Sequence, residues 1–230
     1  MSSEKKPLAV TTIGGYLGAG KTTLVNHLLR HAKGTRLAVL VNEFGELPID
    51  EDLIEAEDED IISIAGGCVC CSYGNDMMAA LMELRNLDPV PDHVLIEASG
   101  VAIPGAILAS IDLLQGFRSD GVVILADVET VQKNAADAFV GDTIERQLAD
   151  ADLVVLNKTD LVDENQTQTV LGWLKLAAPK ASLLPTVNGA IALSVVLGLD
   201  PLVSETAAFD HHGSPFESFV VPMAAIENVT

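Results

Sequence analysis

The chain contains few aromatic residues and few basic residues. Aromatic side chains make up 4% of its 230 residues, and 13 Lys and Arg stand against 33 Asp and Glu, for a formal net charge of −20. With so few aromatics the core must be built from Val, Ile, Leu and Ala, which suits a buried parallel sheet. The shortage of positive charge argues against binding to nucleic acid, which needs a basic face. We interpret the acidity as an aid to solubility or a salt adaptation.

Cysteine is also scarce, and long apolar runs are missing. The 3 cysteines fall within positions 68–71, which is the wrong number and spacing for a disulfide framework and favours a reducing cytoplasm. No apolar run reaches the length of a membrane span, and the polar start of the chain does not resemble a signal peptide. We therefore expect a cytoplasmic protein without a membrane partner.

A phosphate-binding motif stands near the start of the chain. Gly15–Thr22 fits G-x-x-x-x-G-K-[ST], between a β-branched run at 8–13 and helical spacing of apolar residues at 23–29. Backbone N–H groups of such a loop bind phosphate oxygens, Lys21 can reach the β- and γ-phosphates, and the Thr22 hydroxyl can hold Mg²⁺. The alternative is a glycine-rich turn with a chance lysine. The predicted nucleotide-binding residues of this loop are Gly15, Gly18, Ala19, Gly20, Lys21, Thr22 and Thr23.

Apolar runs and helical patterns alternate along the chain. This order predicts βαβ units and an α/β fold, a P-loop NTPase three-layer sandwich with a mostly parallel central sheet flanked by helices. The acidic segment 45–60 lacks periodicity and is predicted to be a mobile loop. The expected strands are 8–13, 36–41, 61–64, 92–97, 121–126, 153–156 and 181–185. The expected helices after the first are 75–85, 105–114, 142–149 and 166–177.

A change of composition near residue 210 suggests a domain boundary. We expect residues 1–209 to form the P-loop domain, and 210–230 to form a linker and the first strand, 216–221, of a truncated further domain. The alternative is that the strand at 216–221 joins the sheet of the P-loop domain.

The predicted strand at 153–156 is followed directly by Asn157-Lys158-Thr159-Asp160, which matches N-K-x-D. The Asp160 carboxylate can accept hydrogen bonds from guanine N1–H and the N2 amino group, a donor pair that adenine lacks. Asn157 can approach the base and brace the phosphate loop, while the Lys158 stem can lie along the purine. The alternative is a polar turn in which Asp160 starts a helix.

A third element, Glu97-Ala98-Ser99-Gly100, ends the strand expected at 92–97. Glu97 is predicted to bind Mg²⁺ through water, because ligands gather at the carboxyl ends of parallel strands. The Gly100 N–H can contact the γ-phosphate and so respond to its loss. A structural acid at the strand end is the rival interpretation of Glu97.

The most unusual stretch is Cys68-Val69-Cys70-Cys71, which follows two glycines. Thiolates bind Zn²⁺, Cu(I) and similar ions, so Cys68, Cys70 and Cys71 are predicted metal ligands, with Glu43 and Glu46 as candidates for a fourth position. Redox sensing competes with this prediction, and buried apolar cysteines are the structural alternative.

The histidines carry weaker signals. His211 and His212 could bind metal, but a solvated linker explains them equally well. His27, His31 and His93 fall on predicted helix or strand positions and are assigned no function.

With these elements in this order, the chain resembles the CobW-like P-loop GTPases, relatives of the maturation GTPases UreG and HypB. The resemblance runs from about Leu8 to Val221, and the C-x-C-C segment is its specific marker. It implies a GTPase that uses GTP, Mg²⁺ and Zn²⁺ or Co²⁺ and delivers a thiolate-bound metal to an unidentified client metalloprotein. A homodimer is one assembly that the chain could form. Residues 42–46 resemble the family's first switch, so the acid Glu43 is implied in water activation or metal binding. The predicted catalytic residues are Lys21, Glu43 and Glu97.

Two other functions compete with this one. The first is a nucleotide-binding metal or redox sensor without significant turnover. The second is a P-loop kinase with structural thiols, against which Asn157 and Asp160 argue because they specify guanine.

Overall fold

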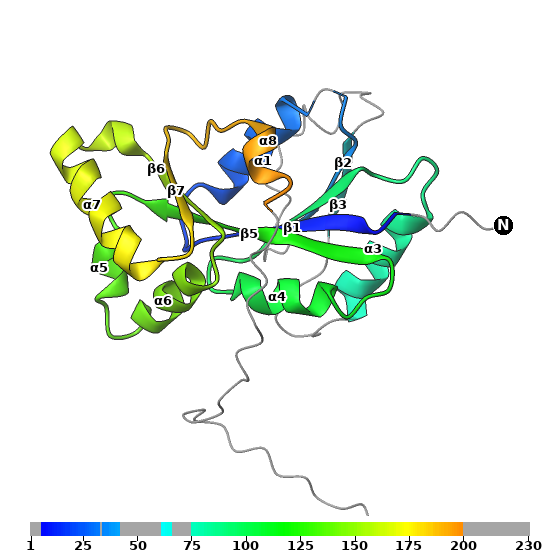
Figure 1. Cartoon of the computed structure of the whole chain (residues 1–230), viewed down its shortest axis with the longest axis horizontal. Helices are drawn as coiled ribbons and strands as arrows, with labels where there is room; N and C mark the ends of the chain where they lie inside the picture. The colour runs from blue at the N-terminus through cyan, green and yellow to red at the C-terminus, as the bar shows by residue number, and fades with distance from the viewer. Residues whose placement is uncertain (1–5, 33, 42–60, 66–74, 200–230) are drawn as a thin grey trace, which may run out of the picture.

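The computed structural model describes residues 6–32, 34–41, 61–65 and 75–199 (Figure 1). Their centre is a seven-stranded sheet in the order β3-β2-β4-β1-β5-β6-β7. Every strand pairing is parallel, as the alternation of strand and helix patterns predicts. The strands are β1 (Leu8–Gly14), β2 (Leu37–Val41), β3 (Ile61–Ala65), β4 (His93–Glu97), β5 (Phe117–Asp127), β6 (Leu153–Asn157) and β7 (Ser182–Pro185).

Helices cover both faces of the sheet and make the three-layer α/β sandwich that the sequence predicts (Figure 1). α1 and α8 lie on one face, and α3, α4, α5, α6 and α7 supply the core on the other. The helices are α1 (Lys21–Arg30), α3 (Asn75–Asn86), α4 (Pro104–Ile111), α5 (Val131–Ala135), α6 (Gly141–Ala149), α7 (Glu164–Ala177) and α8 (Leu193–Val196), with a 3-10 turn η1 (Thr159–Leu161) after β6.

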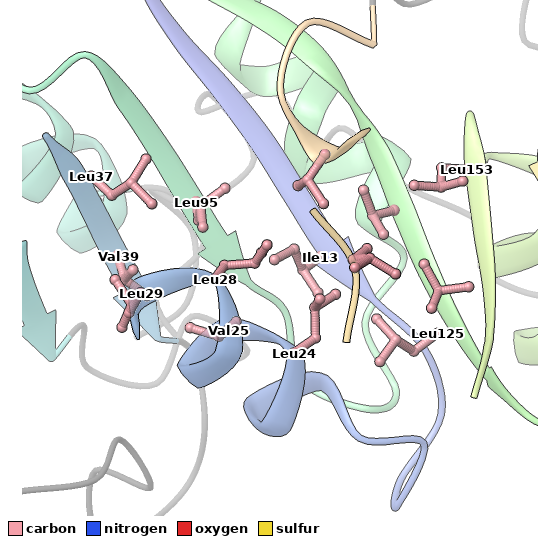
Figure 2. Close-up of a cluster of buried hydrophobic side chains, with 14 of the residues drawn as sticks. Ile13, Leu24, Val25, Leu28, Leu29, Leu37, Val39, Leu95, Leu125 and Leu153 are labelled. Atoms are coloured by element: carbon pink, nitrogen blue, oxygen red, sulfur yellow. The ribbon is translucent and has the colours of Figure 1, made fainter. Parts of the chain in front are cut away.

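Aliphatic side chains fill the core, as the shortage of aromatics requires. Figure 2 shows Leu24, Val25 and Leu28 of α1 packed against β-strand residues that include Ile13 and Leu95. Alternate residues of each strand face opposite layers. In β2, for example, residues 37, 39 and 41 join the α1 side, while 38 and 40 join the α3 side. Burial of both faces explains why the strands read as continuous apolar runs.

β5 is longer than predicted, because it begins at Phe117 rather than at Gly121. The register with β1 skips Asp120, since Val10 pairs with Ser119 and Thr11 with Gly121. Such a β-bulge lets a strand continue past a residue that does not fit the ladder. The charged residues in this stretch hid the strand from the sequence pattern.

The remaining differences concern short elements and ends. α4 begins one residue earlier than predicted, with Pro104 in its first turn, where proline's fixed φ suits a helix. It ends three residues before the predicted Leu114. α5 and α8 were not predicted, because five and four residues are too few to show a helical period. The predicted loop at 45–60, the strand at 216–221 and the linker that precedes it lie outside the described residues. None of the described helices is long and apolar enough to cross a membrane.

Candidate nucleotide site

Four neighbouring strands end at one edge of the sheet, and each ends on a residue of the candidate site. β1 leads into Gly15, β4 ends at Glu97, β5 at Asp127 and β6 at Asn157. The register pairs Ile13 with Glu97 and Asp127 with Asn157, which places these strand ends in one row. Ligands of parallel α/β sheets bind at this edge.

At three positions the backbone of the phosphate loop has a conformation that only glycine adopts readily. Gly15, Gly18 and Gly20 have φ values of 126°, 76° and 101°. A Cβ at Gly15 would collide with the carbonyl of Leu125, and one at Gly20 would collide with the amide of Asn157. The position of a Cβ at Gly18 has no other atom within 4 Å. The loop is therefore packed tightly on its inner side and open at Gly18.

α1 begins directly after this loop, so its first N–H groups point to the open side. Lys21, at its first position, is only 6% exposed. Its Nζ donates to the carbonyl of Tyr16 at 3.4 Å. The amine thus lies across the loop, where a long hydrogen bond to a carbonyl can be replaced by one to a phosphate oxygen.

The Thr22 hydroxyl and the Glu97 carboxylate are in contact. Thr22 Oγ1 donates to Glu97 Oε1 at 2.8 Å, and Glu97 is 2% exposed. A hydroxyl and a carboxylate supply the oxygen donors that Mg²⁺ prefers. The two predicted Mg²⁺ ligands are therefore neighbours, although they lie 75 residues apart in the chain.

Asn157 connects the two predicted nucleotide-binding motifs. Its Nδ2 donates to the carbonyl of Ala19 at 3.0 Å, and its Oδ1 accepts from the N–H of Gly189 at 3.0 Å. The side chain is almost fully buried, and both ends of its amide are used. Asn157 therefore supports the phosphate loop and connects it to the loop that follows β7.

The other residues of the N-K-x-D segment, 158–160, follow Asn157 at the edge of the sheet. Lys158 has a left-handed backbone with φ 63°, and its Nζ pairs with Asp127 Oδ2 at 2.7 Å. Thr159 donates through its N–H and its hydroxyl to the carbonyl of Thr186, at 3.2 and 3.0 Å. Asp160 is exposed. The segment is thus held by its backbone and leaves the Asp160 carboxylate open to solvent.

The alternative role of Asp160 as a helix start does not fit α7. The N-cap of α7 is Asp163, whose Oδ1 accepts from the N–H of Gln166 at 2.8 Å. Asp160 lies instead within the short turn η1. Capping therefore gives no reason for an acid at 160.

The loop after β4, residues 98–103, is held in place by a side chain of α6. Gln147 of α6 is buried, and its Nε2 donates to the carbonyls of Gly100 and Ala102 at 3.1 and 2.8 Å. Gly100 also lies against Leu17 of the phosphate loop, where a Cβ would come within 2.6 Å of Leu17 Cδ2. Gly100 is thus in contact with the phosphate loop and fixed by α6.

Several of the predicted site residues lie outside the described residues. These are Glu43 and Glu46 after β2, the three cysteines after β3, and His211 and His212. Within the described residues, no group of three or more His, Cys, Asp or Glu side chains is placed to hold a metal ion.

Three residues of the site escaped the sequence interpretation. Asp127 could have been found, because it ends a strand at the same edge as Glu97 and Asn157. Gly189 falls in a segment, 186–189, that carries no clear motif, and the structure marks it by its hydrogen bond to Asn157 and by its φ of 62°, with a Cβ position 3.0 Å from the Cα of Leu24. Gln147 gave no signal, because a polar residue on an amphipathic helix normally faces water.

Together, the phosphate loop, the row of strand ends and the braced N-K-x-D segment define a P-loop nucleotide-binding α/β domain. Residues 9–185 match the family described as CobW/HypB/UreG, nucleotide-binding domain. The chain belongs to this family.

Individual relatives agree with this assignment. The chain is 31% identical over an alignment of 261 positions to the zinc chaperone CobW of a Sinorhizobium species, with 95% of this chain and 74% of the relative covered. It is 37% identical over 166 positions to the zinc chaperone YjiA of Escherichia coli K12, with 69% of this chain and 51% of the relative covered. The crystal structure of Zn(II)-bound YjiA GTPase from E. coli is similar with a TM-score of 0.62 and 25% identity, over 86% of this chain and 63% of that one. This chain thus spans between half and three quarters of these proteins.

Proposed function

We propose that this protein binds and hydrolyses GTP, and that the bound nucleotide controls the binding of a thiolate-ligated zinc or cobalt ion that is passed to a client protein. The observation that carries the nucleotide part is the Asn157 side chain, which joins the phosphate loop to the segment containing Asp160. The metal part rests on the cysteines of the sequence and on relatives that are named zinc chaperones.

The described residues fit a nucleotide with Mg²⁺. Gly18 leaves the mouth of the loop open, and the start of α1 offers N–H donors and positive potential to phosphates. Thr22 and Glu97 would hold Mg²⁺ through their adjacent oxygens. Bound with the nucleotide, Mg²⁺ supplies charge neutralisation on the β- and γ-phosphates.

Each protein group has a defined role in hydrolysis. Lys21 moves from the Tyr16 carbonyl to the β- and γ-phosphate oxygens and stabilises the charge that develops there. The Gly100 N–H contacts the γ-phosphate. Glu97 or Glu43 orients a water molecule, whose oxygen bonds to the γ-phosphorus as the bond to the β–γ bridging oxygen breaks. GDP and phosphate are the products.

Asp160 selects the base in this proposal. Its exposed carboxylate accepts hydrogen bonds from the N1–H and N2 amino groups of guanine, while Asn157 keeps the segment at a fixed distance from the phosphate loop. Because the base and the phosphates are covalently joined and can separate only over a limited distance, a fixed spacing between the two loops favours simultaneous binding of both ends.

The sheet register supports a link between the nucleotide and the thiols. Ala65, the last residue of β3, pairs with Val41, which pairs with Glu97. Two strand spacings separate Ala65 from Glu97, which is about 10 Å. Cys68 follows Ala65 by three residues, a length of chain of at most about 11 Å. Glu43 follows Val41 by two residues. The segment that carries the thiols thus follows a strand that lies two places from the strand ending at Glu97, the predicted Mg²⁺ ligand.

Base selectivity can be tested with one substitution. The wild-type protein should prefer GTP to ATP, and Asp160→Asn should weaken GTP binding and improve XTP binding, because xanthine carries a carbonyl at C2 where guanine carries an amino donor. Competition of the three nucleotides against a fluorescent GDP measures this. Equal binding of ATP and GTP by the wild type would overturn the guanine assignment.

The coupling of metal and nucleotide needs a second experiment. Zn²⁺ and Co²⁺ affinities are measured with GDP and with a non-hydrolysable GTP analogue, for the wild type and for the variant with Cys68, Cys70 and Cys71 changed to Ser. We expect the affinity to differ between the two nucleotides, by about fivefold or more, and the difference to vanish in the variant. By linkage the metal must change nucleotide affinity by the same factor. Identical metal affinities in both nucleotide states would overturn the coupling. Turnover too slow to measure, with coupling intact, would instead identify a sensor.

A further inference from the structure

Two histidines stand one above the other at the end of α1. His27 lies in the last turn of the helix and His31 is its C-cap. Residues four apart share a helix face. The two rings have their centres 4.3 Å apart and their planes tilted by 32°. His31 is exposed and His27 is half-buried, so the pair faces solvent.

Each imidazole has one nitrogen engaged by a backbone group. His31 Nδ1 lies 2.7 Å from the carbonyl oxygen of His27. One ring N–H of His27 donates to the backbone of Ile191. In neutral imidazole, an N–H that donates to a carbonyl leaves the other nitrogen with a lone pair. This is the arrangement by which proteins orient a histidine that binds a metal ion.

The environment of His27 also suits metal binding. Partial burial lowers the pKa of His27 below its usual 6.5, and the nearby His31 and Arg30 lower it further, while the hydrogen bond to Ile191 opposes them. His27 is therefore predominantly neutral at pH 7, as a metal ligand must be.

We propose that His27 and His31 form a second metal site, a bis-imidazole site for a borderline divalent ion such as Zn²⁺, Co²⁺, Ni²⁺ or Cu²⁺. Two histidines at positions i and i+4 of a helix are a known pair of Zn²⁺ ligands. With metal–nitrogen distances of about 2.0–2.1 Å and tetrahedral angles, two imidazoles on one ion have ring centres about 5 Å apart. The observed spacing is 4.3 Å, so side-chain rotations that move the rings apart by somewhat less than about 1 Å and turn their free nitrogens together are needed for both to bind one ion.

Two ligands leave the other positions of the ion to water or to donors from another molecule. Such a site holds its ion less tightly than a set of three thiolates and exchanges it more readily. The site is independent of the cysteines and adds to the proposed function a place where an ion can be taken up or passed on. Imidazole selects the borderline ions over Mg²⁺ and Ca²⁺, which prefer oxygen.

The test uses the full chain with Cys68, Cys70 and Cys71 changed to Ser and His211 and His212 changed to Ala, so that His27 and His31 are the remaining imidazole or thiol ligands apart from the buried His93. Zn²⁺ is titrated by calorimetry at pH 7.5, and the imidazole nitrogens are followed by NMR. We expect one Zn²⁺ per chain, with the nitrogen resonances of His27 and His31 shifting together.

Single substitutions show whether one ion is shared. His31→Ala and His27→Gln should each weaken Zn²⁺ binding about tenfold or more, because the second ligand acts at high effective concentration. Gln at 27 keeps a donor for Ile191, and circular dichroism confirms that the variants are folded. Arg30→Gln, on the same turn, is the control and should change binding by no more than about twofold, since exposed charges are screened.

No Zn²⁺ binding in this background, or binding that survives His31→Ala and His27→Gln unchanged, would overturn the site. Since the thiols are absent from every variant in this test, its result does not depend on whether the proposed cysteine site exists.

Discussion

The side-chain amide of Asn157 donates to the backbone carbonyl of Ala19 at 3.0 Å and so fastens the segment after β6 to the phosphate loop. The same side chain accepts a hydrogen bond from Gly189 in the loop after β7. One buried residue therefore holds three loops that meet at the edge of the sheet. The contact also explains Gly20, where any Cβ would collide with the Asn157 amide.

Asn157→Ala should destabilise the protein and weaken nucleotide binding. The change removes two hydrogen bonds and leaves a buried carbonyl and a buried N–H without partners, so the free energy of unfolding should fall by about 2–4 kcal/mol. GDP affinity should fall as well, because the distance between base and phosphate loops is no longer fixed. Urea unfolding and fluorescent GDP binding measure the two effects. Asn165→Ala, at an exposed position of α7, is the matched control and should leave both unchanged. Normal stability of Asn157→Ala would show that the bridge contributes nothing.

Gln147→Leu should affect the response to the γ-phosphate and spare the binding of GDP. Gln147 donates to the carbonyls of Gly100 and Ala102, and Leu has a similar volume but no donor. Without these bonds the loop is no longer fixed beside the phosphate loop, so the preference for a GTP analogue over GDP should fall by about tenfold. Competition binding of the two nucleotides measures the ratio, with Gln168→Leu, at an exposed position of α7, as the control. A ratio equal to that of the wild type would remove Gln147 from the nucleotide response.

Glu97→Gln should alter the dependence on Mg²⁺. The amide oxygen of Gln can still accept from the Thr22 hydroxyl, which Glu97 accepts at 2.8 Å, but the negative charge is lost. Removal of a carboxylate from a Mg²⁺ site should raise the Mg²⁺ concentration needed for half-maximal GTP binding by about tenfold or more. Titration of Mg²⁺ at fixed GTP provides the measurement, and Glu129→Gln, an exposed acid after β5, provides the control. An unchanged Mg²⁺ requirement would favour the structural interpretation of Glu97.

Much of this architecture could be predicted from the sequence. The parallel sheet, the phosphate loop and the strand ends at Glu97 and Asn157 all follow from local patterns, because each motif directly follows a run of buried aliphatic residues. The contact between Thr22 and Glu97 follows in turn from the rule that parallel strands end at one edge.

Contacts between distant polar residues could not be predicted. The first half of β5 contains the charged residues Arg118 and Asp120, and Asp in particular is depleted in strands. Asp120 is buried there because Arg118 pairs with it at 2.8 Å and the Gly198 N–H also donates to it. Gly198 lies 78 residues further along the chain, so no local pattern connects the two. The position of Gln147 escaped prediction for the same reason.

The same polar cluster gives His93 a measurable effect on stability. His93 of β4 is buried, with its Nε2 2.8 Å from Thr11 Oγ1 and 3.7 Å from Asp120 Oδ2. Burial lowers the pKa of His93 to about 4. The negative charge of Asp120 opposes this effect by raising the pKa, and the positive charge of Arg118 lowers the pKa slightly.

Stability should therefore fall as the pH drops below about 6.5. Between that value and about 4 the unfolded chain binds a proton at His93 and the native protein does not, so acid favours unfolding. The loss of stability is small above pH 6.5 and grows below it by up to about 1.4 kcal/mol per pH unit, to a total of about 3–4 kcal/mol once the pH is below about 4. Urea unfolding of the wild type and of His93→Gln at pH 7, 6 and 5 measures it. Gln keeps a polar group near Thr11 but does not titrate, so the wild type should lose more stability than the variant on acidification. Parallel curves for the two proteins would show that His93 is protonated in the native state as readily as in the unfolded chain.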